Sequence, residues 1–409
     1  MSDTVTTQEA TDALGALPVW PDNAVSKRAD LAGAGFAAEL VRDIRALPHW
    51  PLLGDPGSHA LAFQRRDHLE VWMETIGRGL NVTPCFISVR TRNGEPVMLL
   101  PFGIAKKHGI RILTFLDGGV ADYNAPVLYP AAAGLGADDI APLWKAICRA
   151  AGPFDIARLE KMPEQVGGVK NPLHALARQR WHISGHYLTL DDALSVKRPN
   201  PKESRRKLRR LAEHGEVRFG IAAGESEIRA VFEVFLRQKS RRYMESLGHP
   251  GFDVPGQISY YLSLAERLSG RGVQLAYLRV GDEVVATAWN LISGGRLYYM
   301  MAGYEDGKWR RHSPSWLLLE ELVNWSCRNG ITIFDFGIGD ESYKLKWQET
   351  ELPLWSAVHP NSLMGWAWLG AEGTLLKIKK SLPPGVIALL KKCRARLTPR
   401  PALSLSPAK

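Results

Sequence analysis

Residues 275–301, LAYLRVGDEVVATAWNLISGGRLYYMM, decide the fold. Three short runs rich in apolar and aromatic residues are separated by two glycine-bearing turns, Gly281-Asp282 and Gly294-Gly295, and this pattern is typical of an antiparallel meander. Two helical patterns come before the meander, and a third helix and a mostly apolar strand follow it; their expected bounds are 226–245, 258–268, 315–328 and 331–336. This order of helices and strands predicts an α/β unit.

The first half of the chain repeats this pattern. Residues 86–116, FISVRTRNGEPVMLLPFGIAKKHGIRILTFL, read as a second three-stranded meander, in which Asn93-Gly94 is a strong hairpin signal because both residues tolerate positive φ. A one-faced helix is expected before it over 60–77, and a helix over 139–151 and a strand over 154–160 are expected after it. We therefore predict an α/β protein built from two copies of one unit.

The length of 409 residues also favours two domains. We expect an N-terminal leader with a helical region, a first subdomain, a second subdomain and a basic C-terminal segment, with bounds 1–59, 60–195, 196–360 and 361–409. The four cysteines are far apart and form no C-x-x-C pair, which fits a reducing cytoplasm. The first 20 residues lack the features of a signal peptide, and no apolar run approaches about 18 residues. We expect a cytoplasmic protein that at most lies on the inner membrane.

The net charge of +10 is concentrated in two segments. Residues 197–213 hold eight basic and two acidic residues, and residues 377–409 hold nine basic and no acidic ones. The C-terminal segment mixes apolar and basic residues at near-helical spacing, which predicts binding to an anionic membrane surface or, alternatively, a solvated helix. Nucleic acid is not expected as a partner, because this segment lacks the aromatic platforms that single strands stack on.

Several motifs in both halves carry a resemblance. In the second half they are RRKLRRLAEHGEVRF, VATAWNLISGGRLYYMMAGY, a helix opening after KWRRHSPS, and FDFGIGDESYKLKW; in the first half they are AFQRRDHLEVWMETIG and GGVADYNAPVL. In order and spacing they resemble the BioF-like acyltransferase family of the GNAT superfamily, known through the CelD proteins of cellulose biosynthesis. The resemblance covers roughly residues 60–350.

The resemblance implies two tandem GNAT-like subdomains with mixed sheets and transfer of an acyl group from acyl-CoA to an amine or hydroxyl. Some bacterial members of this family acylate long-chain lipid amines to make ceramides, and others belong to exopolysaccharide gene sets. The sequence departs from simple GNAT enzymes at residues 309–315, where it lacks their glycine-rich pyrophosphate loop.

The loop before the helix at 315–328 is the candidate donor site. Ser313 before Pro314 predicts a helix N-cap, which would leave the amides of Ser315 and Trp316 free to bind an anion. Arg310 and Arg311 supply guanidinium groups suited to phosphate, and the resemblance favours the pyrophosphate of coenzyme A over a plain capped helix with surface arginines. The neighbouring His312 is a candidate general base, although a lone loop histidine is more often inert.

The candidate catalytic residues are Asp335, Asp340 and Tyr343. Asp335 interrupts an apolar strand near its carboxyl end, and a buried carboxylate needs a partner or a raised pKa; Lys344 and the arginines are candidate partners. Aminolysis of a thioester needs a base, for which we expect Asp335 or Asp340, and a donor to the oxyanion or leaving thiolate, for which we expect Tyr343. A strand-end salt bridge with a packed tyrosine is the structural alternative.

Candidate substrate-binding residues are Asp122, Tyr123, Lys239, Arg242 and Lys344. The alternative for Asp122 and Tyr123 is a structural role in a turn. The alternative for Lys239 and Arg242 is that they are cations at the end of a helix, where the helix dipole favours positive charge. No metal site is expected, and the motifs of P-loop ATPases, zinc proteases and α/β-hydrolases are absent from the sequence.

The preferred function is acyl transfer from acyl-CoA to an amine of a lipid or envelope acceptor, first of all a long-chain amino alcohol that gives a ceramide-like amide. The alternatives are acylation of an exopolysaccharide precursor, an aminoacyl-tRNA-dependent transferase of the Fem type, whose members share the tandem GNAT architecture, and a non-catalytic binding protein of the envelope machinery.

Overall fold

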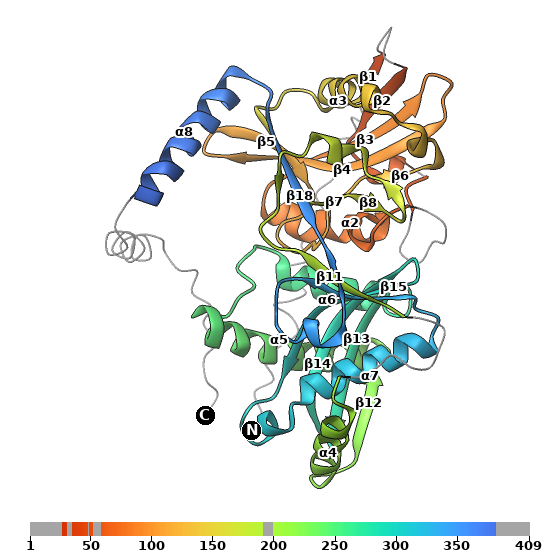
Figure 1. The fold of residues 1–409 in the computed structure, drawn as a ribbon, viewed down its shortest axis with the longest axis vertical. Coiled ribbons are helices and arrows are strands. Elements are labelled where there is room, and N and C mark those ends of the chain that lie inside the picture. Colours follow the sequence, from red (N-terminus) through yellow and green to blue (C-terminus); the bar gives the residue numbers. More distant parts are fainter. Residues whose placement is uncertain (1–26, 31–34, 48, 52–58, 191–198, 382–409) are drawn as a thin grey trace.

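The computed structural model describes residues 27–30, 35–47, 49–51, 59–190 and 199–381 (Figure 1). They form two α/β units, one above the other in Figure 1, each built around one mixed sheet. A small separate hairpin, β8 (Gln165–Val166) with β9 (Val169–Lys170), belongs to neither sheet. The predicted fold class is confirmed.

The first sheet has the strand order β1-β2-β3-β4-β5-β7-β18-β10, and β6 pairs with β4. Its strands are β1 (Lys27–Asp30), β2 (Phe36–Val41), β3 (Thr83–Thr91), β4 (Pro96–Lys107), β5 (Ile110–Phe115), β6 (Val127–Leu128), β7 (Ile156–Pro163), β10 (Gln179–Arg180) and β18 (Leu354–Pro360). The longer helices of this unit are α2 (Arg66–Trp72) and α3 (Ala137–Ala151), and its short helical turns are η1 (Ile44–Ala46), η2 (Ala62–Gln64), η3 (Met73–Gly77), η4 (Pro130–Gly134) and η5 (Pro172–Leu176).

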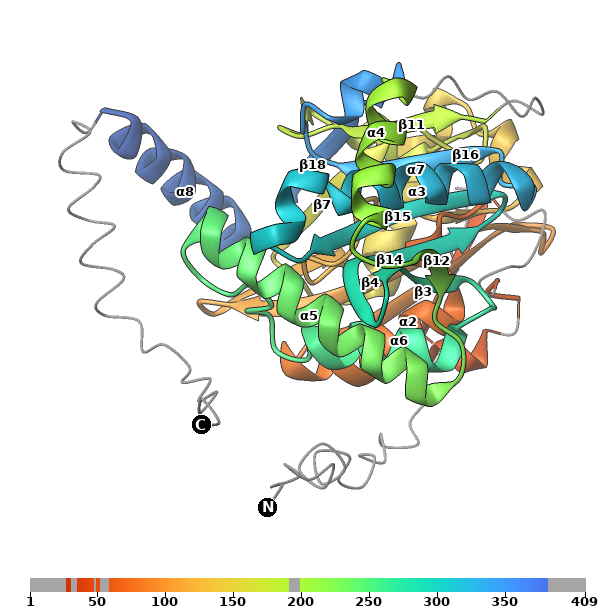
Figure 2. The ribbon, with the colours of Figure 1, turned by 90° about the horizontal axis from the view of Figure 1, so that it is seen from below.

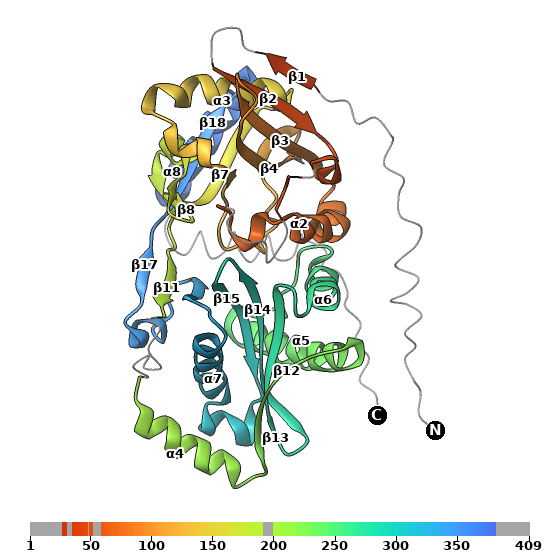
Figure 3. The same ribbon diagram turned by 90° about the vertical axis from the view of Figure 1, so that its right-hand side faces the viewer.

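The second sheet has the strand order β12-β13-β14-β15-β16-β11-β17. Its strands are β11 (Gly185–Thr189), β12 (Val217–Ile221), β13 (Val273–Val280), β14 (Glu283–Ser293), β15 (Arg296–Tyr304), β16 (Ile333–Ile338) and β17 (Thr350–Leu352). Figure 3 shows α5 (Glu225–Leu247) and α6 (Gln257–Leu268) on one face and α7 (Pro314–Arg328) on the other. The remaining elements are α4 (Pro201–Ala212), η6 (Gly307–His312), η7 (Lys344–Trp347) and α8 (Leu363–Ser381).

The predicted repeat is visible in the strand pairing. In each unit an antiparallel meander, β3-β4-β5 or β13-β14-β15, is followed by a helix and a strand that pairs in parallel with the last strand of the meander. The parallel pairs are β5 with β7 and β15 with β16. One of the two hydrophobic clusters spans both units, because Trp289, Tyr298 and Met301 pack with the buried residues of the first unit, and the other cluster lies within the second unit.

Three expectations about the chain's organisation need correction. The N-terminal region is not helical at Phe36–Val41, which is strand β2, because its buried Ala38 and Leu40 complete the sheet beside β3. The helix expected over 60–77 starts only at Arg66, because Arg65 has an extended backbone that separates it from η2, and it then continues without a break from α2 into the π-helical turn η3. The leader over residues 1–26 lies outside the described residues.

The third correction concerns the predicted domain boundaries, because each sheet includes a strand from beyond the boundary expected for its subdomain. Strand β11, expected in the first subdomain, lies in the second sheet between β16 and β17. Strand β18, expected in the second subdomain, lies in the first sheet between β7 and β10. Each sheet therefore contains a strand from the other half of the chain. The two units are linked by hydrogen bonds between strands as well as by the packing of side chains.

Candidate functional site

The candidate site lies where strands β15 and β16 part. Their parallel pairing covers only Arg296–Tyr298 and Ile333–Asp335, although β15 continues to Tyr304 and β16 to Ile338. A bulge in the pairing of β14 with β15 lies at the same level, between the partners Tyr299 and Met301. Beyond this point the facing backbone groups of β15 and β16 do not pair with each other, and the groups of β16 bond instead to the side chains of Asp122, Asp335 and Lys344.

Asp122 of the first unit reaches this point. Its Oδ2 accepts a hydrogen bond from the amide of Ile338 at 3.3 Å, and a Cβ added to Gly337 would meet the same oxygen at 2.5 Å. Burial, and secondly the negative charge of Asp335, raise the pKa of Asp122 to about 7. A carboxylate with a pKa near the working pH is suited to general-base catalysis.

Asp335 lies behind Asp122 and is fully buried. Its Oδ1 accepts from the Tyr123 phenol at 2.8 Å and from the Gly337 amide at 2.7 Å, while its Oδ2 accepts from Arg296 Nε at 2.8 Å. The prediction that this carboxylate needs a partner is confirmed, and the partner is Arg296, which the sequence analysis had not singled out. With both oxygens engaged by the protein, Asp335 joins Tyr123, the neighbour of Asp122 in sequence, to Arg296 and to the end of β16.

Lys239 and Tyr343, from other elements, both lie within the electrostatic influence of Glu341, and Tyr343 also lies within that of Asp122. Burial lowers the pKa of Lys239 to about 8, against the opposing effect of Glu341, and its Nζ lies 4.7 Å from the Tyr243 ring centre. Burial also raises the pKa of Tyr343, with smaller contributions from Tyr299, Glu341 and Asp122. Tyr343 therefore keeps its proton at neutral pH and can donate a hydrogen bond.

Lys344 is buried and acts on the backbone. Its Nζ donates to the carbonyls of Gly337, Ile338 and Gly339 at 3.1, 3.1 and 2.9 Å and pairs with Glu341 at 2.9 Å. An ammonium group has three hydrogens, and these acceptors occupy them. We therefore assign Lys344 to holding the end of β16 and not, as expected, to binding substrate.

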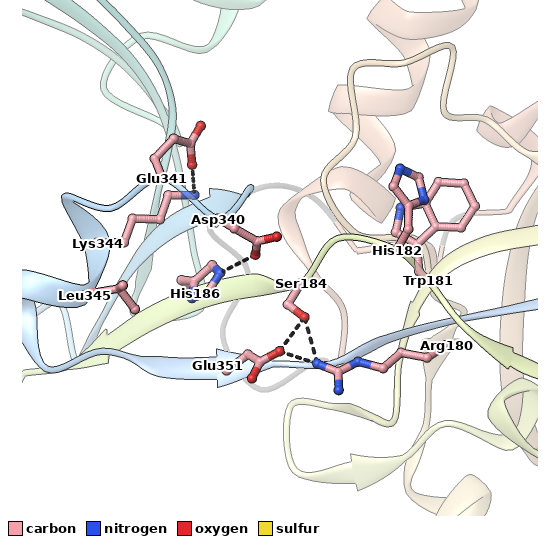
Figure 4. A pocket seen from close by; sticks show the side chains of 10 residues that line it. All are labelled: Arg180, Trp181, His182, Ser184, His186, Asp340, Glu341, Lys344, Leu345 and Glu351. Carbon is pink, nitrogen blue, oxygen red and sulfur yellow. Dashed lines mark hydrogen bonds and ion pairs between the residues drawn. The ribbon is translucent and has the colours of Figure 1, made fainter. Parts of the chain in front are cut away.

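Asp340 lines a cavity of about 540 Å³ beside the Asp122 site (Figure 4). Its Oδ1 lies 3.2 Å from His186 Nε2, and the other ring nitrogen of His186 lies 3.0 Å from Glu349 Oε1. Opposite them, Ser184 bonds to both Arg180 and Glu351. Asp340 is thus not joined to Asp335, and His186 was missed because no sequence spacing links it to residues about 150 positions away.

The predicted donor residues divide into two groups. Arg310 is exposed and pairs with Asp306 at 3.8 Å, and Arg311 donates to His312 Nε2 at 3.1 Å. The pKa of His312 is lowered by burial and then by Arg311, and its ring packs on His214, 5.3 Å away. The contacts of these three residues are with one another, with Asp306 just before η6 and with His214 just after α4, so the structure does not bring His312 to Asp335.

Ser313 and Trp316 line a second cavity of about 480 Å³ between the starts of α4 and α7. The backbone of Ser313 has the left-handed conformation, with φ 51°, and its hydroxyl accepts a hydrogen bond of 3.0 Å from Lys207 Nζ. The amide of Trp316 donates to the Ser313 carbonyl at 3.0 Å, so the expectation that this amide is free was wrong. Lys207 and Lys346 line the cavity and were missed, whereas Ser315 is not among its lining residues.

Arg242 lies on the surface of α5. It pairs with Glu245 at 2.9 Å and covers the Tyr304 ring at 5.2 Å, which matches the simpler expectation of a helix-end cation. Within the described residues, no group of three or more His, Cys, Asp or Glu side chains is placed to hold a metal ion.

Comparisons with known proteins agree with this geometry. Residues 200–345, just over a third of the chain, match the family model of the acetyltransferase (GNAT) domain. No curated protein matches the chain. The crystal structure of FemX is similar over 72% of this chain and 95% of its own, with 11% identity and a TM-score of 0.50.

Two further solved structures are similar at lower scores. They are L-PGS from Bacillus licheniformis (13% identity, 76% of this chain and 95% of that one, TM-score 0.46) and a tandem GNAT protein from the clavulanic acid biosynthesis pathway (13%, 77% and 91%, TM-score 0.41). The finer resemblance to the CelD-type branch stays a prediction. Residues 200–345 are similar to the acetyltransferase domain of the GNAT type, and the whole molecule is a tandem of two GNAT-like α/β units.

Proposed function

We propose that the protein transfers an acyl group to an amine and that Asp122 is the base. The observation that carries this proposal is the position of Asp122, a carboxylate with a pKa of about 7 at the point where β15 and β16 part. A protonated amine cannot attack a carbonyl carbon, so a group that accepts its proton near neutral pH is the first requirement of the reaction.

The other residues divide the remaining tasks. The amine gives a proton to Asp122 and its nitrogen forms a bond to the acyl carbon as the bond to the leaving group breaks. Backbone N–H groups of β15 beyond Tyr298 are suited to the oxyanion, and the neutral phenol of Tyr343 is suited to giving a proton to the leaving atom. Asp335 and Lys344 fix the end of β16 around these groups.

Acyl-CoA is the donor we favour, and the cavity between α4 and α7 fits its phosphates. Lys207 and Lys346 provide positive charge, Ser313 provides a hydroxyl, and Trp316 provides an apolar wall. Two ammonium groups beside a hydroxyl are suited to a pyrophosphate. Arg310 and Arg311 are exposed beside the same helix and are secondary candidates for phosphate contacts.

For the acceptor we keep the long-chain amino alcohol, giving a ceramide-like amide at the inner membrane surface. The basic segments over 197–213 and 377–409 support this choice, because they favour the anionic surface where such an amine resides. An exopolysaccharide precursor as acceptor and a non-catalytic envelope role are the remaining alternatives.

A Fem-type transferase using aminoacyl-tRNA is a second candidate with its own supporting observation. The outward face of α4 exposes five cations, Lys202, Arg205, Arg206, Arg209 and Arg210, next to the cavity that we assign to the donor. Such a row is suited to the phosphates of tRNA as well as to a membrane surface. The similarity to FemX is a likeness of fold and does not choose between the donors.

Release of free thiol from a long-chain acyl-CoA by the purified protein, with and without sphinganine in mixed micelles, tests the proposal. Sphinganine-dependent release that is lost in Asp122→Asn supports it. Release that persists in Asp122→Asn refutes Asp122 as the base. No release, together with tight tRNA binding that weakens steeply with salt, favours the Fem-type candidate.

A further inference from the structure

Helix α8 is anchored to the first unit at its start. The Asn361 amide donates to the Asp155 carbonyl at 2.8 Å, and the Ser362 hydroxyl donates to Asp155 Oδ1 at 2.8 Å. At Gly365 the helix passes so close that an added Cβ would lie 2.0 Å from the Asp155 carbonyl oxygen. The direction of the first turns is therefore fixed by the body of the protein (Figures 1 and 2).

The residues that face the body recur at helical spacing. Trp368 stacks on His108 at 5.9 Å, and Glu372 pairs with Arg158 at 2.7 Å. Gly365, Trp368, Leu369 and Glu372 follow the i, i+3, i+4, i+7 pattern of one helix face and are the less exposed positions. The single charged residue between 363 and 374 thus points inward.

The opposite face of α8 is apolar and exposed. Leu363, Met364 and Trp366 keep 89%, 61% and 66% of their surface accessible, and the other outward positions are Ala367, Gly370, Ala371 and Thr374. A surface helix ordinarily turns its charged residues to solvent and its apolar residues to the core. The first three turns of α8 have the reverse arrangement, which is typical of a surface that meets an apolar phase.

Positive charge lies beside this face in the structure and follows it in the sequence. The stacking of Trp368 on His108 brings α8 against the tip of the β4–β5 hairpin, where Lys106 and Lys107 are exposed. The chain beyond residue 376 adds nine basic residues and no acidic one. Apolar and tryptophan side chains bordered by lysines suit the headgroup boundary of an anionic bilayer.

We propose that α8 docks the protein on an anionic bilayer, with Leu363, Met364 and Trp366 inserted at the headgroup boundary and Lys106 and Lys107 on the phosphates. This inference concerns a surface outside the acyl-transfer site and does not depend on the chemistry proposed for that site. It also differs from binding by the basic C-terminal segment alone, because it assigns insertion to three apolar side chains of the described helix.

The test is flotation of the full chain with vesicles of phosphatidylcholine, with and without phosphatidylglycerol. We expect binding to the anionic vesicles only, and a loss of at least about tenfold in the variant Leu363→Gln/Met364→Gln/Trp366→Gln. The matched control Leu80→Gln/Leu247→Gln removes exposed apolar side chains elsewhere and should bind as the parent does. Lys106→Gln/Lys107→Gln should weaken binding and reduce its dependence on salt.

Unchanged flotation of the triple variant would overturn the proposal, even if removal of residues 382–409 abolished binding. A self-associating parent protein that becomes monomeric in the triple variant, without vesicle binding by either, would also overturn it and assign the face to a second copy of the chain. Thermal unfolding of each variant identifies any loss of fold. If the triple variant does not fold, the single variant Trp366→Phe, which should retain most of the vesicle binding, is measured in its place.

Discussion

The phenol of Tyr123 donates a hydrogen bond of 2.8 Å to Asp335 Oδ1, joining the two GNAT-like units across 212 positions of sequence. Both side chains are fully buried, and the Tyr123 ring also lies over the guanidinium of Arg296, 5.7 Å away. Gly185 of β11 packs so closely on Tyr123 that an added Cβ would lie 2.4 Å from the phenol oxygen. Because Asp122 precedes Tyr123, this contact fixes the peptide that carries the proposed base.

Tyr123→Phe should therefore lower both stability and activity. Loss of a buried hydrogen bond to a charged group costs about 1.5–3 kcal/mol, and the released Asp122 should reduce kcat more than it changes KM. Urea unfolding and steady-state kinetics measure the two effects. Tyr129→Phe is the matched control, because Tyr129 Oη donates to the His49 carbonyl at an exposed position and should matter less. Equal losses of activity in the two variants would contradict the special role of Tyr123.

Asp335→Asn should shift the pH dependence of the reaction. The negative charge of Asp335 raises the pKa of Asp122, so its removal lowers that pKa and moves the acid limb of the kcat/KM profile to lower pH. The variant also leaves Arg296 without its ion pair, at a cost of about 3–5 kcal/mol in unfolding free energy. Removing both partners in Asp335→Asn/Arg296→Met should recover part of that stability. Complete loss of activity at every pH in a folded variant would instead indicate that Asp335 is the base.

The fold was largely predictable because its signals are local. The meanders and their turns follow from short-range alternation, and the elements expected over 258–268 and 315–328 match α6 (Gln257–Leu268) and α7 (Pro314–Arg328) closely. The exchange of β11 and β18 between sheets was not predictable, since nothing within a five- or seven-residue strand specifies which distant edge it joins.

The site was predictable in part for the same reason. Asp335 was found because a carboxylate in an apolar strand is a local anomaly, and Asp122 because it lies in a motif that carried the family resemblance. Arg296 and His186 were missed, since each owes its role to a partner brought together only by the tertiary fold, Asp335 in one case and Asp340 in the other. The prediction that Lys344 binds substrate was based on its charge alone, whereas in the structure its ammonium group donates its hydrogens to backbone carbonyls.

Asp122→Asn should abolish activity and stabilise the fold at alkaline pH. Removal of a general base costs about 10²–10⁴ in rate. The folded-state pKa of about 7 lies above the ordinary value of 3.8, so between these values the folded state binds the proton more strongly. Stability of the parent protein should therefore fall as pH rises from about 4 to about 7 through this group. The Asn variant does not lose this stability, so its free energy of unfolding at pH 8 should exceed that of the parent by about 1–3 kcal/mol.

Thermal unfolding of the parent and Asp122→Asn from pH 5 to pH 8 measures this difference. The difference between the two stabilities should be smallest at pH 5, should grow as the pH rises and should level off above about pH 7. Parallel curves would show that the carboxylate is not perturbed and would remove the main support for its role as base. Glu95→Gln, an exposed carboxylate on a turn, is the control and should give parallel curves.

The double variant Lys207→Ala/Lys346→Ala should raise KM for an acyl-CoA donor with little change in kcat. Both side chains line the cavity at the start of α7, where they would meet phosphates and not the reacting carbonyl. Loss of two charge-assisted hydrogen bonds, at about 1.5–3 kcal/mol each, corresponds to at least a tenfold rise in KM. Arg310→Ala/Arg311→Ala removes the same charge from exposed η6 and should have a smaller effect. A larger effect of the arginine pair would move the donor phosphates from this cavity to η6. The same comparison with a dephosphorylated donor fragment, an acyl-pantetheine, should abolish the difference between the parent and Lys207→Ala/Lys346→Ala, because no phosphate remains for the two lysines to bind.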